Sequence, residues 1–376
     1  MVATRRSLRD AGWFTPDRPP PDLMRQLDLV ALATVCDVMP LQGLNRALVA
    51  QGLKVMARRD RTGLAALMEI ASVTKAPDAF SCGFALGPRI NAGGRIAEAA
   101  LGLNLLRCTD RTVARQMAER LDAVNRRRQD VEATILDLAM EQAAAQKEAG
   151  RGVILLAGRD WHPGVVGIVA GRIKERFNRP ALVGAEQEDG SIKGSGRSVP
   201  GLDLGTVIIA ARQAGMLKTG GGHAMAAGFS LEAERLEEFH SFLDTRLPQA
   251  TDLPDTVDLL LDAVVSVSGA SAELAQQMGA MAPFGAGNPE PMVALSHATI
   301  IRTDRIGRDG NTLRVLLRAD NGARLKALLF RAEDSPLTPV LEDSTRPPLH
   351  LAGYLRAESW NGRMDATFFI QDIARA

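Results

Sequence analysis

The sequence predicts an α/β protein of several domains: a helical N-terminal region, one long helix, a small α/β domain and a C-terminal β-barrel. Three observations predict it. Helical apolar spacing dominates residues 1–148, strand and helix patterns alternate from 152 to 230, and short strand patterns fill the chain after residue 252. The length of 376 residues agrees, because a single core rarely grows this large. We place the domains at 1–108, 109–148, 149–248 and 252–376.

The first region, 1–108, reads as mostly helical. Residues 22–38 are apolar with few breakers, and prolines stand on both sides of them. Residues 45–58 continue with apolar side chains at helical spacing. We therefore expect one helix in each of these two segments.

The second region, 109–148, reads as a single helix. Thr109 can cap its N-terminus, and Asp110 suits the positive end of the helix dipole. Apolar residues recur in steps of three, four and seven. A helix of this length runs roughly 60 Å, which is longer than a small domain is wide. We therefore predict a connector between two lobes rather than a core element.

The third region alternates strands and helices. Strand patterns cover 152–158, 180–185, 191–198 and 224–231, and helical patterns cover 162–177, 204–213 and 231–247. Such alternation predicts a small sheet covered by helices.

The fourth region is rich in strands. Strand patterns occupy 256–266, 292–307, 311–319, 324–332, 349–358 and 364–374, with one helical pattern at 271–281. The segments Asp309–Asn311 and Asn361–Gly362 are hairpin turn signals. Short strands with one interposed helix predict a small closed barrel such as an OB-fold.

Composition narrows the class of protein. No apolar run is long enough to span a membrane, and no secretory signal follows the basic N-terminus. The three cysteines are far apart and odd in number, which indicates a reducing cytoplasm. The net charge is only +1, yet residues 302–331 hold eight basic and three acidic side chains. That strip either follows a phosphate backbone or is an ordinary solvated sheet face.

Asp37 ends the apolar segment ALATVCD, just before Pro40. A carboxylate in that setting needs a partner. A bound Mg²⁺ or Mn²⁺ is one such partner, and a helix cap or a buried salt bridge is another.

A second motif, GPRINAGGR, sets Arg89, Asn91 and Arg95 among three glycines. Glycine lets a backbone approach an anion, and arginine grips phosphate oxygens with two hydrogen bonds. The alternative is a structural turn with an exposed arginine.

Two further motifs come from the α/β region. Ser195 and Arg197 in GSGRS lie two apart, so in a strand they share a face and can clamp a phosphate. In TGGGH, Gly221 and Gly222 precede His223, and a glycine run of this kind can form an anion nest. An ordinary strand end and a structural histidine are the alternatives.

Taken in order, these segments resemble the RecJ family of DHH-type phosphoesterases. LDLVALATVCDVMPL is similar to the fourth conserved motif of that family, LGPRINAGGRI to the segment before its connecting helix, and AERLDAVNRRRQDVE to that helix. TGGGHAMAAGFS and SGRS resemble the DHH-associated substrate-binding domain, and APFGAGNPEP resembles the start of its OB-fold.

The resemblance implies a 5′→3′ exonuclease specific for single-stranded DNA, acting in repair and recombination with Mn²⁺ or Mg²⁺. It makes Asp37 a metal ligand in a remnant of the DHH domain. It assigns Arg89, Asn91, Arg95, Ser195, Arg197, Gly221, Gly222 and His223 to the substrate, and the barrel to the strand upstream of the cut. It also implies a single-strand-binding protein and a helicase as partners, and no membrane.

One departure qualifies the expected activity. The Asp-His-His triplet of the family does not occur in this sequence, and the first residues resemble the helix that follows it. We therefore expect an N-terminally truncated chain that binds DNA with little catalysis. A non-catalytic single-stranded DNA-binding module, a smaller DHH-type oligonucleotide phosphoesterase and a tRNA-synthetase editing domain are the alternatives. The strand-rich tail argues against the phosphoesterase, and GPRINAGGR against the editing domain. Deleting residues 252–376 should lower the affinity for long strands.

Overall fold

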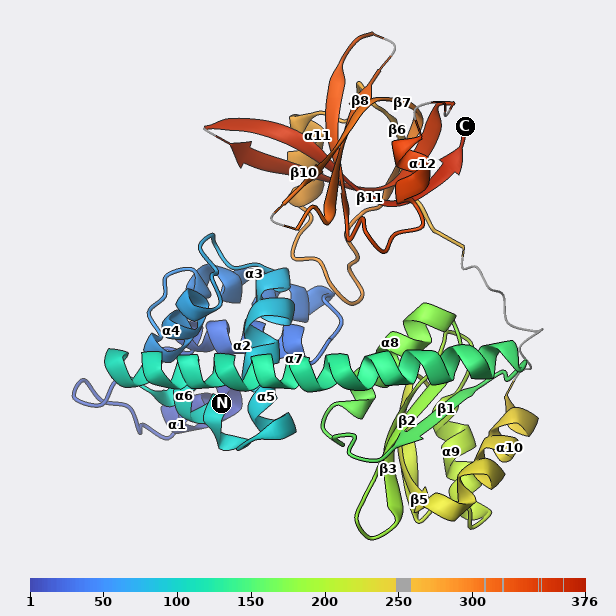
Figure 1. Cartoon of the computed structure of the whole chain (residues 1–376). Helices are drawn as coiled ribbons and strands as arrows, with labels where there is room; N and C mark the ends of the chain where they lie inside the picture. Colours follow the sequence, from blue (N-terminus) through green and yellow to red (C-terminus); the bar gives the residue numbers. More distant parts are fainter. Residues whose placement is uncertain (248–257, 308, 320, 344, 346, 361) are drawn as a thin grey trace. The chain divides into compact units, whose positions relative to one another are not determined.

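The structure is a computed structural model that describes every residue except 248–257, 308, 320, 344, 346 and 361 (Figure 1). The chain divides into two compact units. The first comprises Met1–Arg58, Pro77–Cys82 and Asp258–Ala376, and the second comprises Arg59–Ala76 and Gly83–Val257.

The first unit begins with helices. α1 spans Val2–Asp10, the 3-10 turn η1 spans Leu23–Gln26, α2 spans Leu27–Cys36 and α3 spans Gly43–Met56. The segment expected as one helix is therefore split, because the Asp22 carboxylate accepts a hydrogen bond from the Met24 amide and starts a separate turn. α2 and α3 pack closely at Gly52, where a Cβ atom would lie 2.1 Å from the Leu27 carbonyl oxygen.

The same unit contains the barrel. Its strands are β6 (Ala263–Ser266), β7 (Val293–Ile306), β8 (Thr312–Arg318), β9 (Arg324–Phe330), β10 (Leu349–Trp360) and β11 (Arg363–Arg375). They follow the order β10-β11-β9-β8-β7-β6, and an added β10–β7 pairing closes a ring of five. Helix α11 (Ala272–Gly279) confirms the expected helix. The predicted OB-like barrel is confirmed, and α12 (Thr338–Glu342) is an addition.

The turn that precedes β7 also packs on the helices of this unit. The Leu41 amide donates to the Ala286 carbonyl at 2.6 Å, and Gln42 Nε2 donates to Gly287 at 2.9 Å. Arg46 adds a hydrogen bond to the Met281 carbonyl. The turn before β7 is thus fixed by the loop between α2 and α3 and by Arg46 of α3. Two predicted details, Asn361 and the start of strand 256–266, lie outside the described residues.

The second unit opens with α4 (Thr62–Ile70), α5 (Gly87–Ile96), α6 (Ala100–Arg107) and α7 (Arg111–Glu148). The π-turn η2 (Ser81–Leu86) precedes α5. GPRINAGGR, for which a structural turn was the alternative to a phosphate contact, is the helix α5, with Pro88 in its first turn where a missing amide hydrogen costs nothing. Its glycines serve packing: a Cβ on Gly93 would lie 2.7 Å from the Glu98 carbonyl oxygen.

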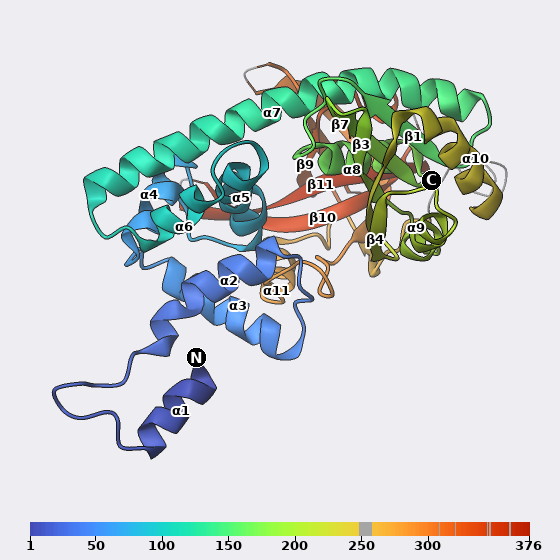
Figure 2. The ribbon, with the colours of Figure 1, turned by 90° about the horizontal axis from the view of Figure 1, so that it is seen from below.

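Helix α7 confirms the predicted long helix and corrects two details. The N-cap is Asp110, whose carboxylate accepts from the Val113 amide at 2.9 Å, and not Thr109. The helix is also a core element. Its first half packs on α4, α5 and α6, and its second half packs on α8 and β1 (Figure 2). Small buried residues such as Ala118 and Ala139 allow this close contact.

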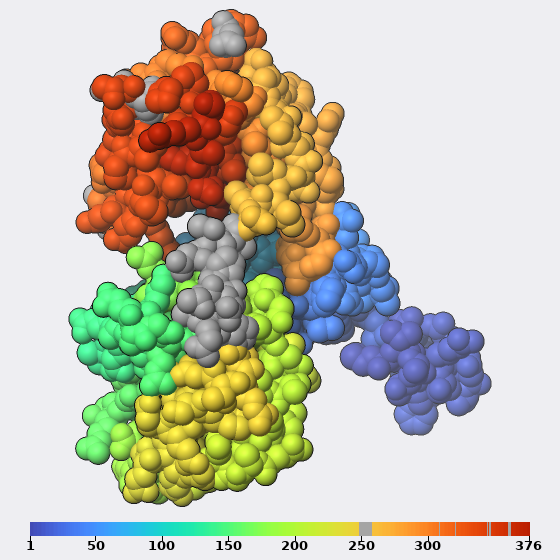
Figure 3. All heavy atoms as spheres, turned by 90° about the vertical axis from the view of Figure 1, so that its right-hand side faces the viewer, coloured from blue at the N-terminus to red at the C-terminus, as the bar shows by residue number. Residues whose placement is uncertain are grey.

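The α/β part of the second unit is the predicted sheet between helices. The strands β1 (Ile154–Gly158), β2 (Ala181–Glu186), β3 (Ser191–Arg197), β4 (Thr219–His223) and β5 (Ala226–Glu232) follow the order β1-β2-β3-β5-β4. Helix α8 (Val166–Phe177) lies against β2 and β3, and α9 (Leu204–Gln213) lies against β4 and β5. The space-filling view shows the surface of α9 and of α10 (Leu236–Arg246) (Figure 3).

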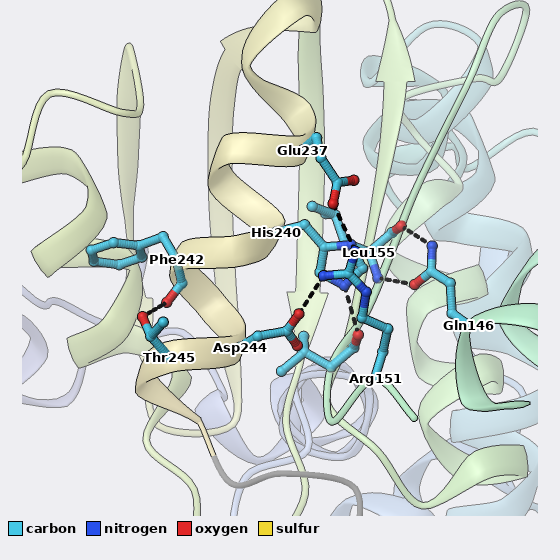
Figure 4. Close-up of polar contacts among 9 residues, drawn as sticks. Gln146, Arg151, Leu155, Glu237, His240, Phe242, Asp244 and Thr245 are labelled. Atoms are coloured by element: carbon cyan, nitrogen blue, oxygen red, sulfur yellow. Dashed lines mark hydrogen bonds and ion pairs between the residues drawn. The ribbon is translucent and has the colours of Figure 1, made fainter. Parts of the chain in front are cut away.

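Polar side chains secure the outer edge of this sheet (Figure 4). The Gln146 amide pairs with the Leu155 backbone, donating to its oxygen at 2.7 Å and accepting from its nitrogen at 2.9 Å. Arg151 forms ion pairs with Asp244 and Glu237 of α10. The edge strand β1 is therefore capped by side chains rather than left open to pairing.

Candidate anion-binding site

The site is built where the end of α5 meets the start of α8. Arg95 Nη1 donates to the Gly164 carbonyl at 3.0 Å. A Cβ on Gly164 would lie 2.1 Å from the Arg95 carbonyl oxygen, so only glycine permits this approach. His162 Nδ1 accepts from the Gly164 amide at 3.0 Å and shapes the turn into α8. Arg95 is thereby held beside the positive N-terminal end of a twelve-residue helix.

Ser195 and Arg197 extend this site from β3. Arg197 Nη1 donates to Ser195 Oγ at 2.9 Å, which confirms that the two side chains share a face. A Cβ on Gly167, in the first turn of α8, would lie 3.0 Å from Ser195 Oγ and 3.2 Å from Arg197 Nη2. The serine hydroxyl, the guanidinium and the start of α8 therefore surround one small volume.

The charges around the two arginines shift their pKa values. Burial lowers the pKa of Arg197, and the positive charge of Arg95 lowers it further. The pKa of Arg95 is lowered by burial and by Arg128, and is raised by Glu132. Within the described part of the chain, no carboxylate forms an ion pair with Arg197. Two cations this close favour an anion between them.

His223 lies on the same face of the sheet. Arg197 pairs with Ala226 and Ala226 pairs with His223, so all three side chains point one way. The next row on that face is Ser195, Gly228 and Gly221. A Cβ on Gly221 would meet no atom within 4 Å. Gly221 and Gly228 thus form an open strip on this face of the sheet, beside Arg197.

The glycine run does not form the predicted anion nest. It is the edge strand β4, in which alternate residues face opposite sides. Gly222 faces α9, and a Cβ there would lie 2.4 Å from the Ala226 carbonyl oxygen. Gly222 is therefore needed for packing, whereas Gly221 and His223 face the open strip.

Of the predicted residues on α5, Asn91 is exposed and lies one turn before Arg95. Arg89 points to the other side. Its Nε donates to the buried Asp122 carboxylate at 2.8 Å, and its Nη1 donates to the Ala85 carbonyl at 2.7 Å. Arg89 thus anchors α5 to α7.

Asp37 is the C-terminal capping residue of α2, and its side chain is exposed. Within the described residues, no three His, Cys, Asp or Glu side chains gather as metal ligands. A divalent cation needs several oxygen ligands, so Asp37 and its described neighbours do not fit such a site.

The basic strip on the barrel is less open than the sequence predicts. Arg302 and Arg314 pair with Asp304, Arg305 pairs with Glu342, and Lys326 pairs with Glu358. Arg318 and Arg324 face each other across β8 and β9, and both are exposed. Arg308 lies outside the described residues. Like charges opposite each other are unfavourable without an anion, so this pair is the best remaining phosphate contact of the strip.

Sequence reasoning missed the polar network beneath Arg95. Arg128 on α7 is buried, donates to Asn125 Oδ1 at 3.2 Å and pairs with Glu132 at 2.5 Å. Arg172 of α8 lies 4.0 Å from the same carboxylate. The spacing of Arg128 and Glu132 was an available signal, because residues four apart meet on a helix.

Comparisons with known proteins agree with this architecture. The DHHA1 domain family matches residues 150–248, and the RecJ OB domain family matches residues 261–372. The chain is 40% identical to the single-stranded-DNA-specific exonuclease RecJ of Dickeya dadantii and 35% identical to that of Escherichia coli. Each alignment covers 99% of this chain and 65% of the relative.

Among solved structures, RecJ of Thermus thermophilus in complex with Mg²⁺ matches with a TM-score of 0.77 and 30% identity. The match covers 95% of this chain and 53% of that one. RecJ from the same organism has also been solved with Mn²⁺. Divalent metals are thus bound by relatives. The chain spans about half to two thirds of the length of the curated relatives.

The fold and the matched domains define a class: proteins in which a DHHA1 domain is joined to an OB barrel. Within that class the chain belongs to the RecJ family, as the resemblance predicted. Within the described residues, no helix is long and apolar enough to cross a membrane.

Proposed function

We propose that this chain is the DNA-binding part of a 5′→3′ exonuclease specific for single-stranded DNA. The supporting observation is the convergence of Arg95, Ser195 and Arg197 at the start of α8. These groups suit a terminal phosphate, because guanidinium, hydroxyl and helix amide groups all donate to phosphate oxygens. A pocket that grips a terminal phosphate sets the end at which the strand is held.

The rest of the strand would follow the open strip. Gly221 and Gly228 leave room for a sugar–phosphate backbone, and His223 stands at its border as a hydrogen-bond donor. Asn91 would add a contact from α5. Gly222 and Arg89 would act by holding β4 and α5 in place. On the barrel, Arg318 and Arg324 would bind phosphates of the strand upstream of the cut.

The experiment is binding of this chain to a short single strand with either a 5′ phosphate or a 5′ hydroxyl. We expect tighter binding of the phosphorylated strand, and R197Q should lower that preference at least about tenfold, since a hydrogen bond to a charged group contributes about 1.5–3 kcal/mol. Arg159 is an exposed arginine of the same domain that pairs with Glu186, so R159Q serves as the control. An unchanged preference in R197Q would refute the phosphate pocket.

A non-catalytic single-stranded DNA-binding module is the second candidate. The absence of a metal-ligand cluster from the described residues favours it for this chain. With Mn²⁺ added, both candidates predict binding without turnover for this chain, because Asp37 alone offers too few ligands. An Asp-His-His motif encoded in frame upstream of Met1 would distinguish them in favour of the exonuclease. Sustained release of nucleotides would count against the module. Mn²⁺ or Mg²⁺ as cofactor of the whole protein, and a single-strand-binding protein and a helicase as partners, stay predictions.

A further inference from the structure

The carboxylate of Glu132 on α7 lies between two arginines, Arg128 of α7 and Arg172 of α8, and Arg172 also pairs with Glu175. Glu132 Oε2 accepts from Arg128 Nη1 at 2.5 Å, and Glu132 Oε1 is 4.0 Å from Arg172 Nε. The Glu132 side chain is 14% exposed and that of Arg128 is 10% exposed. Both charges are thus largely withdrawn from water and depend on each other.

Residues elsewhere on α7 also secure the helix. Asp122 joins α7 to α5 through Arg89, and Asp110 caps the helix. Ile135 and Ala139 pack in the core beneath α8. Burying Arg128 and Glu132 carries a desolvation cost that an apolar pair would avoid. The pair therefore calls for a role beyond packing.

That role concerns the charge beside Arg95. Arg128 and Glu132 both act on Arg95, in opposite directions. Arg172 of α8 approaches the same carboxylate. The Glu132 charge therefore offsets part of the attraction that a phosphate would feel at Arg95.

We propose that Glu132 is a built-in counter-charge that weakens the grip of the pocket on the terminal phosphate. The inference rests on the proposed function. An enzyme that removes nucleotides from a 5′ end must release the held phosphate with each nucleotide, so too tight a grip would stall it. Glu132 acts through the arginines, which makes it a positioning and charge-balancing residue.

The test compares E132Q with the unaltered chain in binding to 5′-phosphorylated and 5′-hydroxyl single strands at low salt. Glutamine keeps an oxygen for Arg128 and removes the charge. We expect roughly three- to tenfold tighter binding of the phosphorylated strand alone, and a smaller difference at high salt. E141Q, an exposed carboxylate of the same helix, should change neither affinity. A merely structural Glu132 would weaken binding to both strands.

Folding of E132Q gives a second measurement. E132Q removes the counter-charge, so sulfate bound by Arg95 and Arg197 should stabilise this variant more than it stabilises E141Q. The thermal midpoint of E132Q should therefore rise more steeply with sulfate than that of E141Q. Equal sulfate responses, or a variant that stays unfolded in sulfate, would refute the counter-charge.

The two proposals fail in different ways. If the unaltered chain shows no preference for a 5′ phosphate, the proposed function fails. If the preference is present and abolished in R197Q, but E132Q does not strengthen it, the counter-charge alone is wrong.

Discussion

At the scale of the residue, the site shows that adjacent residues of a strand have different roles because they face opposite sides of the sheet. Gly221 and Gly222 were predicted together as phosphate-binding backbone, yet only Gly221 faces the open strip. Ser195 and Arg197, two apart, stay on one face. The spacing of side chains predicted that sharing correctly, because strand geometry alone dictates it. It could not tell which face would be open.

The glycines of β4 supply a matched pair of variants. G222A should lower stability by about 1–3 kcal/mol, because its Cβ would lie 2.4 Å from the Ala226 carbonyl oxygen. G221A should fold normally, since its Cβ meets no atom within 4 Å, but should bind single-stranded DNA several-fold more weakly. Thermal unfolding and a binding titration measure both. If G221A binds DNA like the unaltered chain, the strip does not carry the strand.

Arg89 and Arg95 differ for a similar reason. Both looked like phosphate ligands in GPRINAGGR, but α5 turns them to different sides. Arg89 reaches the buried Asp122 of α7, whereas Arg95 reaches the start of α8. The roles of the two arginines therefore depend on their positions around α5, and the motif alone did not show which neighbour each position faces.

At the scale of the element, α7 was predicted nearly to its ends, since the periodicity of its apolar residues depends only on local sequence. Its place was not predicted. Length suggested a bare connector, but buried alanines let α5 and α8 approach it closely. The alanines of α7 give no signal in the sequence, but in the folded chain they form the surface against which neighbouring helices pack.

The N-cap of α7 tests this element directly. D110A removes the acceptor of the Val113 amide and should lower stability by about 1 kcal/mol. Thr109 is exposed and precedes Asp110, and T109A should change stability little. Urea unfolding of both variants gives the comparison. A larger loss in T109A would restore Thr109 as the capping residue.

At the scale of the whole molecule, the barrel topology followed from strand count and turn signals, and the β10–β7 pairing closes it as an OB-like barrel must. The net charge of the basic strip on the barrel surface could not be predicted from the same sequence signals. Glu342 and Glu358 lie outside the basic strip in sequence, yet they neutralise Arg305 and Lys326. The truncation of residues 252–376 is also a poor test, because Leu41 and Gln42 of the helical part bond to the turn before β7.

Surface variants of the intact chain are the cleaner test of the barrel. R318Q combined with R324Q should weaken binding of long single strands and reduce the dependence on salt by about one unit of slope for each phosphate that is no longer bound. The preference for a 5′ phosphate should remain. R115Q combined with R120Q removes the same charge from exposed positions of α7. Equal losses of affinity in the two double variants would mean that the barrel arginines add only general charge.

The sequence by itself determined the order of domains, the long helix, most of the strands and the family, because periodicity, turn residues and ordered motifs are local properties of the chain. Tertiary structure alone decided which polar residues meet. Arg95 comes from α5 and Ser195 and Arg197 come from β3, two segments far apart in the sequence, and the Glu132 counter-charge depends on how α7 packs against α8. Contacts between side chains of different elements arise from the packing of those elements, and the local sequence pattern does not predict that packing.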